Sequence, residues 1–150
     1  MRERLKVLAI ASAGGHWTQL MRLRAAFAEC EVVFVSTLDQ SSANPGCSFV
    51  QVPDANRREK FLLTKLAVKM AGVVLRERPD VVISTGAAPG LIGLFFGRLT
   101  GSRTIWLDSI ANVDRLSLSG NCARWAADLW LTQWSHLTNS HGPTYLGSVV

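Results

Sequence analysis

The chain has 150 residues, 48% hydrophobic and 18% charged, a composition that fits one domain with a single core and excludes an intrinsically disordered protein. It contains no run of eighteen uncharged apolar residues, so we expect no transmembrane helix. The net charge of +5 indicates a polyanionic partner, such as a nucleic acid, an acidic membrane surface or a phosphorylated substrate, unless the basic surface is simply solvated.

Short apolar runs alternate with helical patterns along most of the chain. In chain order, we predict a strand over 5–11, a helix over 17–29, strands over 32–36 and 49–52, a helix over 59–78, a strand over 81–84, a helix over 91–99, a strand over 104–107, a helix over 122–128, and strands over 129–132 and 144–146. Short apolar strands separated by helices are typical of a parallel sheet covered on both faces. The pattern therefore predicts an α/β fold with a Rossmann-like, doubly wound, mostly parallel sheet.

Two glycine-rich turns follow the first and the fourth predicted strands. The first is Gly14-Gly15-His16, and the second runs from Thr85 to Gly90. Doubly wound sheets bind ligands at the carboxyl ends of their strands, near the point where the strand order reverses. The first and fourth strands are neighbours in the usual order, so we expect both turns to face one crevice.

The first turn has the features of an anion site rather than of a dinucleotide site. A helix that begins at a glycine turn presents backbone N–H groups to an anion. The pattern G-x-G-x-x-G is absent, because Gly14 and Gly15 are adjacent and no third glycine follows, and the chain has no P-loop. His16 is either a plain polar residue at a helix start or an imidazole beside a diphosphate or a hydroxyl that must lose a proton.

Two further patterns leave alternatives open. The helix over 59–78 carries a basic stripe within about 40° of arc, which is either a solvated face or a face lying on an anionic bilayer. The stripe consists of Arg58, Lys65, Lys69 and Arg76. Four tryptophans suit a subunit interface, a membrane boundary or a core. They are Trp106, Trp125, Trp130 and Trp134. Nucleic-acid binding is disfavoured, because the basic and aromatic residues form no recognisable module.

Four segments of the chain resemble a known family in their order and spacing. They are AGGHWTQL over 13–20, RPDVVISTGAAPG over 78–90, DSIA over 108–111 with SLSG over 117–120, and ADLWLTQW over 127–134. Together these segments are similar to the asparagine-linked glycosylation protein 14 family, including its bacterial exopolysaccharide and capsule members.

The resemblance implies a GT-B glycosyltransferase that is split into two chains. This chain, as one Rossmann-like domain over 1–150, would be the N-terminal, acceptor-binding half, similar to that half of MurG-type enzymes. A small catalytic partner subunit would supply the C-terminal half, which binds the UDP-sugar donor; no other cofactor and no metal is implied. The acceptor would be a polyprenyl-diphosphate-linked saccharide. The enzyme would lie in the cytoplasm, peripherally on the inner face of the plasma membrane, held by basic and apolar surface.

The resemblance also implies roles for particular residues. We expect His16 to be the base or hydrogen-bond partner of the acceptor hydroxyl, and Asp108 to orient a sugar hydroxyl or His16. The expected substrate-binding residues are Gly14, Gly15, Thr18, Gly86, Pro89, Gly90, Ser109 and Arg115. Where similar members carry an arginine and a lysine, this chain has Asn112 and Asn121, so Arg115 is the candidate to compensate.

Two rival hypotheses stay open at this point. One is a non-catalytic membrane scaffold that recruits the catalytic subunit, in which His16 and Asp108 are dispensable. The other is a free-standing nucleotide-binding α/β enzyme, which the missing third glycine disfavours.

Overall fold

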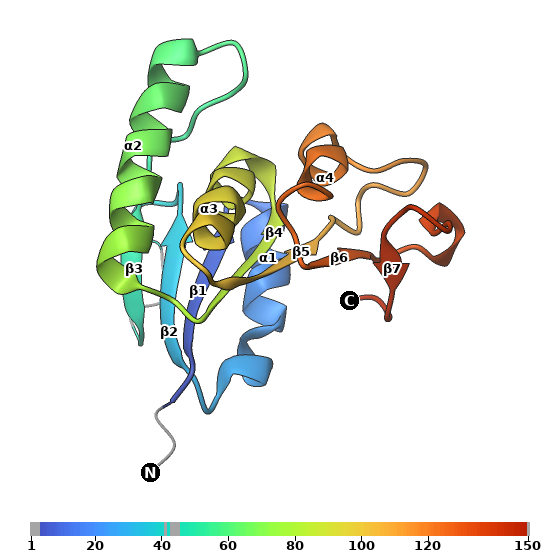
Figure 1. Cartoon of the computed structure of the whole chain (residues 1–150), viewed down its shortest axis with the longest axis horizontal. Helices are drawn as coiled ribbons and strands as arrows, with labels where there is room; N and C mark the ends of the chain where they lie inside the picture. The colour runs from blue at the N-terminus through green and yellow to red at the C-terminus, as the bar shows by residue number, and fades with distance from the viewer. Residues whose placement is uncertain (1–3, 41, 43–45, 150) are drawn as a thin grey trace.

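The structure, a computed structural model that describes residues 4–40, 42 and 46–149, contains a seven-stranded sheet (Figure 1). The strands are β1 (Lys6–Ala11), β2 (Glu31–Ser36), β3 (Ser48–Gln51), β4 (Val81–Gly86), β5 (Arg103–Leu107), β6 (Leu129–Thr132) and β7 (Thr144–Tyr145). Their order across the sheet is β3-β2-β1-β4-β5-β6-β7, and each neighbouring pair runs parallel. The predicted doubly wound α/β fold is confirmed, with the strand order reversing between β1 and β4.

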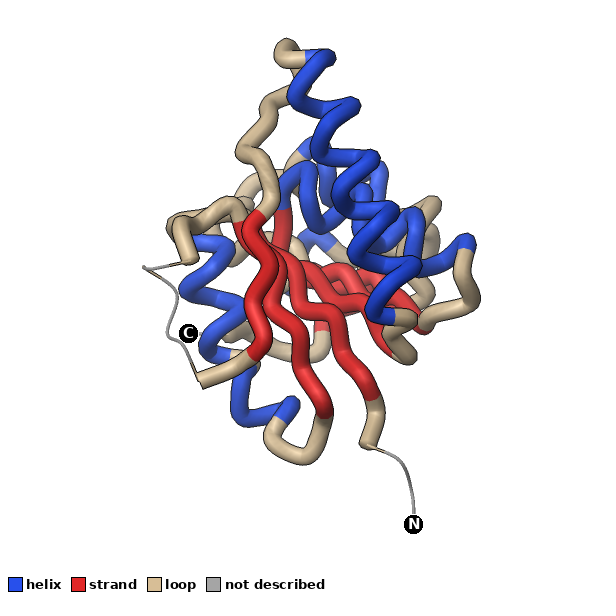
Figure 2. Tube along the Cα trace, turned by 90° about the vertical axis from the view of Figure 1, so that its left-hand side faces the viewer, coloured by secondary structure: helices blue, strands red, loops and turns tan. Residues whose placement is uncertain are grey.

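Helices cover both faces of this sheet (Figures 1 and 2). One face carries α2 (Lys60–Glu77), α3 (Ala87–Leu99) and α4 (Leu118–Ala123), and the other carries α1 (Gly15–Arg22) and the 3-10 turn η1 (Arg24–Phe27). A second 3-10 turn, η2 (Ser135–Leu137), lies between β6 and β7. After Lys6, the strand β1 is apolar because alternate residues enter two separate cores, with Leu8 and Ile10 in one and Ala9 in the other.

The helix predicted over 122–128 is wrong. The structure has α4 at Leu118–Ala123, which overlaps the predicted helix only at Cys122 and Ala123, and residues 124–126 form a turn. The helix begins there because the Ser117 hydroxyl accepts a hydrogen bond of 2.8 Å from the N–H of Gly120 and so caps it. Because glycine and serine are also loop residues, the periodic pattern alone missed this cap.

The helix predicted over 17–29 is two pieces, α1 and η1, which meet at Leu23. Trp17, the neighbour of His16, anchors the start of α1 on the sheet. Its indole packs edge to face against Phe34 and Phe49, with ring centroids 5.8 Å apart in both pairs. The aromatic contacts therefore hold the first glycine turn at the top of β1.

The helix α3 lies unusually close to the sheet because three of its residues lack a side chain. A Cβ at Gly93 would overlap Ile10, and a Cβ at Gly97 would lie 2.6 Å from Cγ2 of Val82. The structure starts α3 at Ala87, four residues before the predicted start at residue 91, so the second glycine turn forms its first turn. Among the described residues, no helix has the length and apolar character needed to cross a bilayer.

We expect Gly97→Ala to lower the free energy of unfolding by about 1–3 kcal/mol, because the added methyl must displace Val82, whose β-branched side chain is stiff. Gly72→Ala is the matched control, since a Cβ there meets open space on the exposed side of α2. The control should raise the free energy of unfolding by up to about 1 kcal/mol through helix propensity. Urea denaturation of both variants measures the difference, and equal effects would contradict the close approach of α3.

Candidate functional site

The two glycine turns meet at the carboxyl end of β1 and β4, as predicted. The strands pair in parallel, with Ile10 opposite Ser84 and Ala11 opposite Gly86, so Thr85 is an extra residue in β4. Extra residues of this kind redirect the backbone and are common beside active sites. Here the irregularity lies at the point where the strand order reverses, and it turns Thr85 toward the start of α1.

Thr85 holds His16 at two points. The imidazole Nδ1 lies 2.9 Å from the Thr85 carbonyl oxygen, and the buried Thr85 hydroxyl donates a hydrogen bond of 2.7 Å to the His16 carbonyl. A carbonyl only accepts, so Nδ1 carries the proton in this arrangement. The neutral imidazole then keeps its lone pair on Nε2, which is the form that a general base requires.

Gly86 packs directly against this imidazole. A Cβ at Gly86 would overlap Cε1 and Nδ1 of His16, and the φ of 142° at Gly86 is one that side chains rarely adopt. The next residue, Ala87, has a φ of 70°, a left-handed conformation that costs a non-glycine residue about 1–2 kcal/mol. Backbone strain of this kind gathers at ligand sites, so it supports the placement of the site here.

The first turn of α1 presents its backbone N–H groups at the same place. Gly14 is the N-cap residue with a φ of 83°, and the N–H of Thr18 donates a hydrogen bond of 3.1 Å to its carbonyl. The N–H groups of Gly15, His16 and Trp17 precede that bond in the helix, where they are available to an anion. Side-chain atoms added at Gly14 or Gly15 would meet open space, so the approach to these N–H groups is clear.

Three of the expected substrate-binding residues have other contacts. The Thr18 hydroxyl donates to the Gly14 carbonyl at 3.2 Å and so supports the turn. Pro89 and Gly90 are buried, and a Cβ at Gly90 would overlap Ser84. These two residues therefore set the approach of α3 to the sheet, whereas Gly86 is the residue of the second turn that faces His16.

Asp108 is buried and organises the loop after β5. Its carboxylate accepts hydrogen bonds from the hydroxyl and the N–H of Ser117 (2.8 and 3.1 Å), the amide of Asn112 (2.9 Å) and the indole of Trp106 (3.2 Å). The expectation that Asp108 orients His16 is therefore corrected, because the Thr85 carbonyl holds the imidazole Nδ1. Four donors on one buried carboxylate satisfy it fully, which makes Asp108 a positioning residue for this loop.

A buried amide network joins α1 to the loop after β5 and was missed by the sequence reasoning. The side chain of Gln19 donates a hydrogen bond of 3.0 Å to the hydroxyl of Ser109, which was expected to touch substrate. Gln133 donates to the Gln19 side-chain oxygen at 2.6 Å and to the Asp108 carbonyl at 3.0 Å. Gln19 and Gln133 stand in the segments TQL and TQW, which belong to the family-like stretches of the sequence, but only the fold brings the two side chains together.

Arg115 lies on the exposed rim of a cavity of about 440 Å³ beside the start of α4. The cavity is also lined by Asn112 and Asn121, the two positions at which similar family members were expected to carry cations. The structure thus brings Arg115 to the same hollow as both asparagines. This geometry is compatible with the idea that Arg115 compensates for the missing basic residues.

The basic stripe is smaller than predicted, because Arg58 precedes α2 and only Lys65, Lys69 and Arg76 lie on the helix. All three are exposed, and Arg76 forms an ion pair of 2.8 Å with Glu77. Of the four tryptophans in question, Trp106 is fully buried, while Trp125 is 71% exposed. The indoles of the other two donate hydrogen bonds to backbone carbonyls of 2.9 and 2.8 Å. The core interpretation therefore describes Trp106 and Trp130, which packs against the buried cluster, whereas Trp134 is half-buried outside both core clusters.

Comparisons with known proteins agree with this architecture, although no protein-family model matches the chain. The chain is 25% identical over 186 residues to the mouse UDP-N-acetylglucosamine transferase subunit ALG14, and 27% identical over 187 residues to the human one. Both matches cover 99% of this chain and 85% of the relative. They confirm the resemblance to the asparagine-linked glycosylation protein 14 family.

Solved structures with the same fold include MurG from Acinetobacter baumannii, with a TM-score of 0.77 and 13% identity. The UDP-N-acetylglucosamine 2-epimerase from Rickettsia bellii matches with a TM-score of 0.68 and 14% identity. These matches cover 94% and 89% of this chain but only 45% and 40% of the two solved chains. The chain thus spans less than half the length of either enzyme.

The contact between His16 and Thr85 predicts which imidazole nitrogen carries the proton. In protein with ¹⁵N-labelled histidine, at a pH where the imidazole is neutral, we expect His16 to show a protonated Nδ1 and an unprotonated Nε2. His136 serves as the internal contrast, because its Nε2 lies 2.6 Å from the Val113 carbonyl oxygen, so its Nε2 should carry the proton. A protonated Nε2 at His16 would rule out the arrangement, since Nδ1 would then have no hydrogen to donate to the carbonyl.

Proposed function

We propose that this chain is the acceptor-binding subunit of a two-chain glycosyltransferase that moves a sugar from a UDP-sugar to a polyprenyl-diphosphate-linked saccharide. The coarser statement, a glycosyltransferase subunit, is supported by the mammalian relatives, which are named as UDP-N-acetylglucosamine transferase subunits, and by the MurG-like fold. The observation that carries the finer proposal is His16, whose Nδ1 is held by Thr85 between the two glycine turns, beside N–H groups with a clear approach. Among the described residues, its Nε2 has no hydrogen-bond partner.

The chemistry follows from these groups. An acceptor diphosphate bound at the start of α1 would lie against the N–H groups of Gly15, His16 and Trp17 and the positive end of the helix dipole. The acceptor hydroxyl would then face Nε2 of His16. Its oxygen forms the new bond to the anomeric carbon of the sugar as the bond to the UDP oxygen breaks, and its proton passes to Nε2. The displacement inverts the anomeric centre, and UDP leaves with the bonding electrons.

A partner subunit would supply the site for the UDP-sugar. The first turn lacks the third glycine of the dinucleotide pattern, and the chain matches less than half of MurG. A second chain with the fold of the other half would place the donor opposite His16, across the crevice above β1 and β4.

The exposed face of α2 suits a peripheral position on the cytoplasmic surface of a membrane. Phe61, Val68 and Leu75 are 82%, 69% and 62% exposed and recur at intervals of seven, so they form one apolar row along the helix. At 100° per residue, Lys65 lies about 60° and Lys69 about 100° from the middle of this row, both on the same flank of the helix. A row of apolar side chains bordered by cations is the pattern of a helix lying on an anionic bilayer.

For the base role, we expect His16→Ala to reduce kcat by about 10²–10⁴-fold when assayed with the partner subunit, because the acceptor hydroxyl loses its proton acceptor. The KM for the acceptor should change much less. His141→Ala is the matched control and should keep full activity, since His141 lies on an exposed loop. Near-normal turnover of His16→Ala would instead favour the non-catalytic scaffold.

For the membrane role, we expect the double variant Lys65→Ser, Lys69→Ser to bind vesicles of anionic lipid more weakly by on the order of tenfold, with the loss shrinking at high salt. Arg103→Ser, which removes an exposed cation from the start of β5, is the control and should bind as the original chain does. Vesicle sedimentation measures both. Equal binding of the double variant would show that α2 does not face the bilayer.

A further inference from the structure

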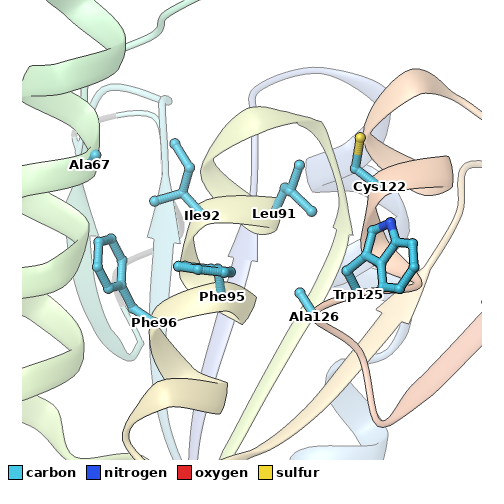
Figure 3. A pocket seen from close by; sticks show the side chains of 8 residues that line it. All are labelled: Ala67, Leu91, Ile92, Phe95, Phe96, Cys122, Trp125 and Ala126. Carbon is cyan, nitrogen blue, oxygen red and sulfur yellow. The ribbon is translucent and has the colours of Figure 1, made fainter.

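An apolar cavity of about 360 Å³ lies between α2, α3 and the turn that follows α4 (Figure 3). It is lined by Ala67, Leu91, Ile92, Phe95, Phe96, Cys122, Trp125 and Ala126. No lining residue carries a charge, and the side chains come from α2, from α3, and from α4 with the turn that follows it, with α3 between the other two (Figure 3). The volume falls in the range of sites that bind small apolar ligands.

The cavity is connected to the candidate site through α3. Leu91 and Phe95 follow Ala87 at steps of four residues, so the three share one side of the helix. At 1.5 Å per residue, Leu91 lies about 6 Å and Phe95 about 12 Å along the axis from the second glycine turn. That turn packs on His16 through Gly86. The apolar lining therefore begins one helical turn away from the proposed catalytic group.

We propose that this cavity binds the isoprenoid chain of the acceptor, in the stretch next to its diphosphate. The inference rests on the proposed function and adds to it a site for the lipid part of the substrate. With the diphosphate at the start of α1, the chain would pass the second glycine turn and follow α3 between Phe95 and Trp125. Those two side chains are 53% and 71% exposed, and a bound isoprenoid would cover them.

Shape and lining favour an isoprenoid chain over other occupants. A bilayer is a surface and meets outward-facing side chains such as Phe61 and Val68 on α2, whereas this space is a concave groove that is partly open to solvent. A protein partner normally needs polar groups for its hydrogen bonds, about one per 100–200 Å² of interface. The Arg124 guanidinium lies 4.4 Å from the centroid of Trp125 and stacks on its indole.

The test uses the full-length chain with farnesyl diphosphate as the probe and inorganic diphosphate as the headgroup control. Ala67→Phe fills the cavity from α2, and Val68→Phe adds the same ring to the neighbouring, outward-facing position as a matched control. Calorimetry measures the affinity. The exposed thiol of Cys122, which lines the cavity, is alkylated with and without the probe, and peptide mapping separates it from the other cysteines.

We expect farnesyl diphosphate to bind at least tenfold more tightly than inorganic diphosphate and to protect Cys122 from alkylation. Each buried methylene contributes roughly a fourfold gain in affinity. Ala67→Phe should therefore weaken the binding of farnesyl diphosphate by about tenfold or more, whereas Val68→Phe should change its affinity by no more than about twofold. Equal affinity of the two diphosphates, an unprotected Cys122, or equal effects of the two variants would overturn the proposal. So would displacement of the probe by the partner subunit, because the cavity would then be a protein interface.

A second measurement separates this inference from the proposed function. With the partner subunit present, the KM for acceptors should fall as their isoprenoid chain is lengthened in detergent solution, and Ala67→Phe should remove that dependence. If the KM for the acceptor does not depend on the length of its isoprenoid chain and Cys122 is not protected, the proposed role of the cavity is wrong, while the proposed glycosyltransferase activity still holds. Protection of Cys122 without transfer to any acceptor would support the cavity while the proposed activity fails.

Discussion

The pairing of β1 with β4 is the constraint on which the site depends. The two strands are distant in sequence, yet their parallel pairing brings the first and second glycine turns to one point. The extra residue Thr85 then turns a backbone carbonyl and a hydroxyl toward His16. A regular pairing would leave this imidazole without the carbonyl that selects its tautomer. A single irregularity in a buried sheet therefore determines the chemical form of the candidate base.

A second requirement is that the polar groups under the site be fully paired. Asp108 is buried with four hydrogen bonds, and Gln19 and Gln133 complete a network that links α1 to the loop after β5. Among the described residues, every buried side-chain nitrogen and oxygen has a hydrogen-bond partner. Buried networks that are completely satisfied rigidify their surroundings. The loop after β5 is therefore held firmly at its buried start, although Ala111 and residues 113–115 are exposed.

The helix α3 connects the two binding regions that the proposed acceptor would need, one for its diphosphate and one for its lipid chain. Its first turn, with strained Ala87, faces the imidazole, and one side further along is apolar and lines a cavity. Gly93 and Gly97 let the same helix lie close to the sheet, which keeps both ends in a fixed relation. A diphosphate site and an apolar site on one rigid helix match an acceptor in which a charged group joins a lipid chain.

The sequence by itself determined the order of strands and helices, the positions of the two glycine turns and their common edge, because periodicity and turn residues are local properties. The bounds of α4 and the role of Asp108 depend on side-chain contacts within nine residues, which a periodic pattern does not report. The hold of Thr85 on His16 and the pairing of Gln19 with Gln133 were decided only by the tertiary structure. Their partners lie elsewhere in the chain: His16 and Thr85 are 69 residues apart, and Gln19 and Gln133 are 114 apart. Which atom a side chain faces depends on such distant contacts, and no local pattern encodes them.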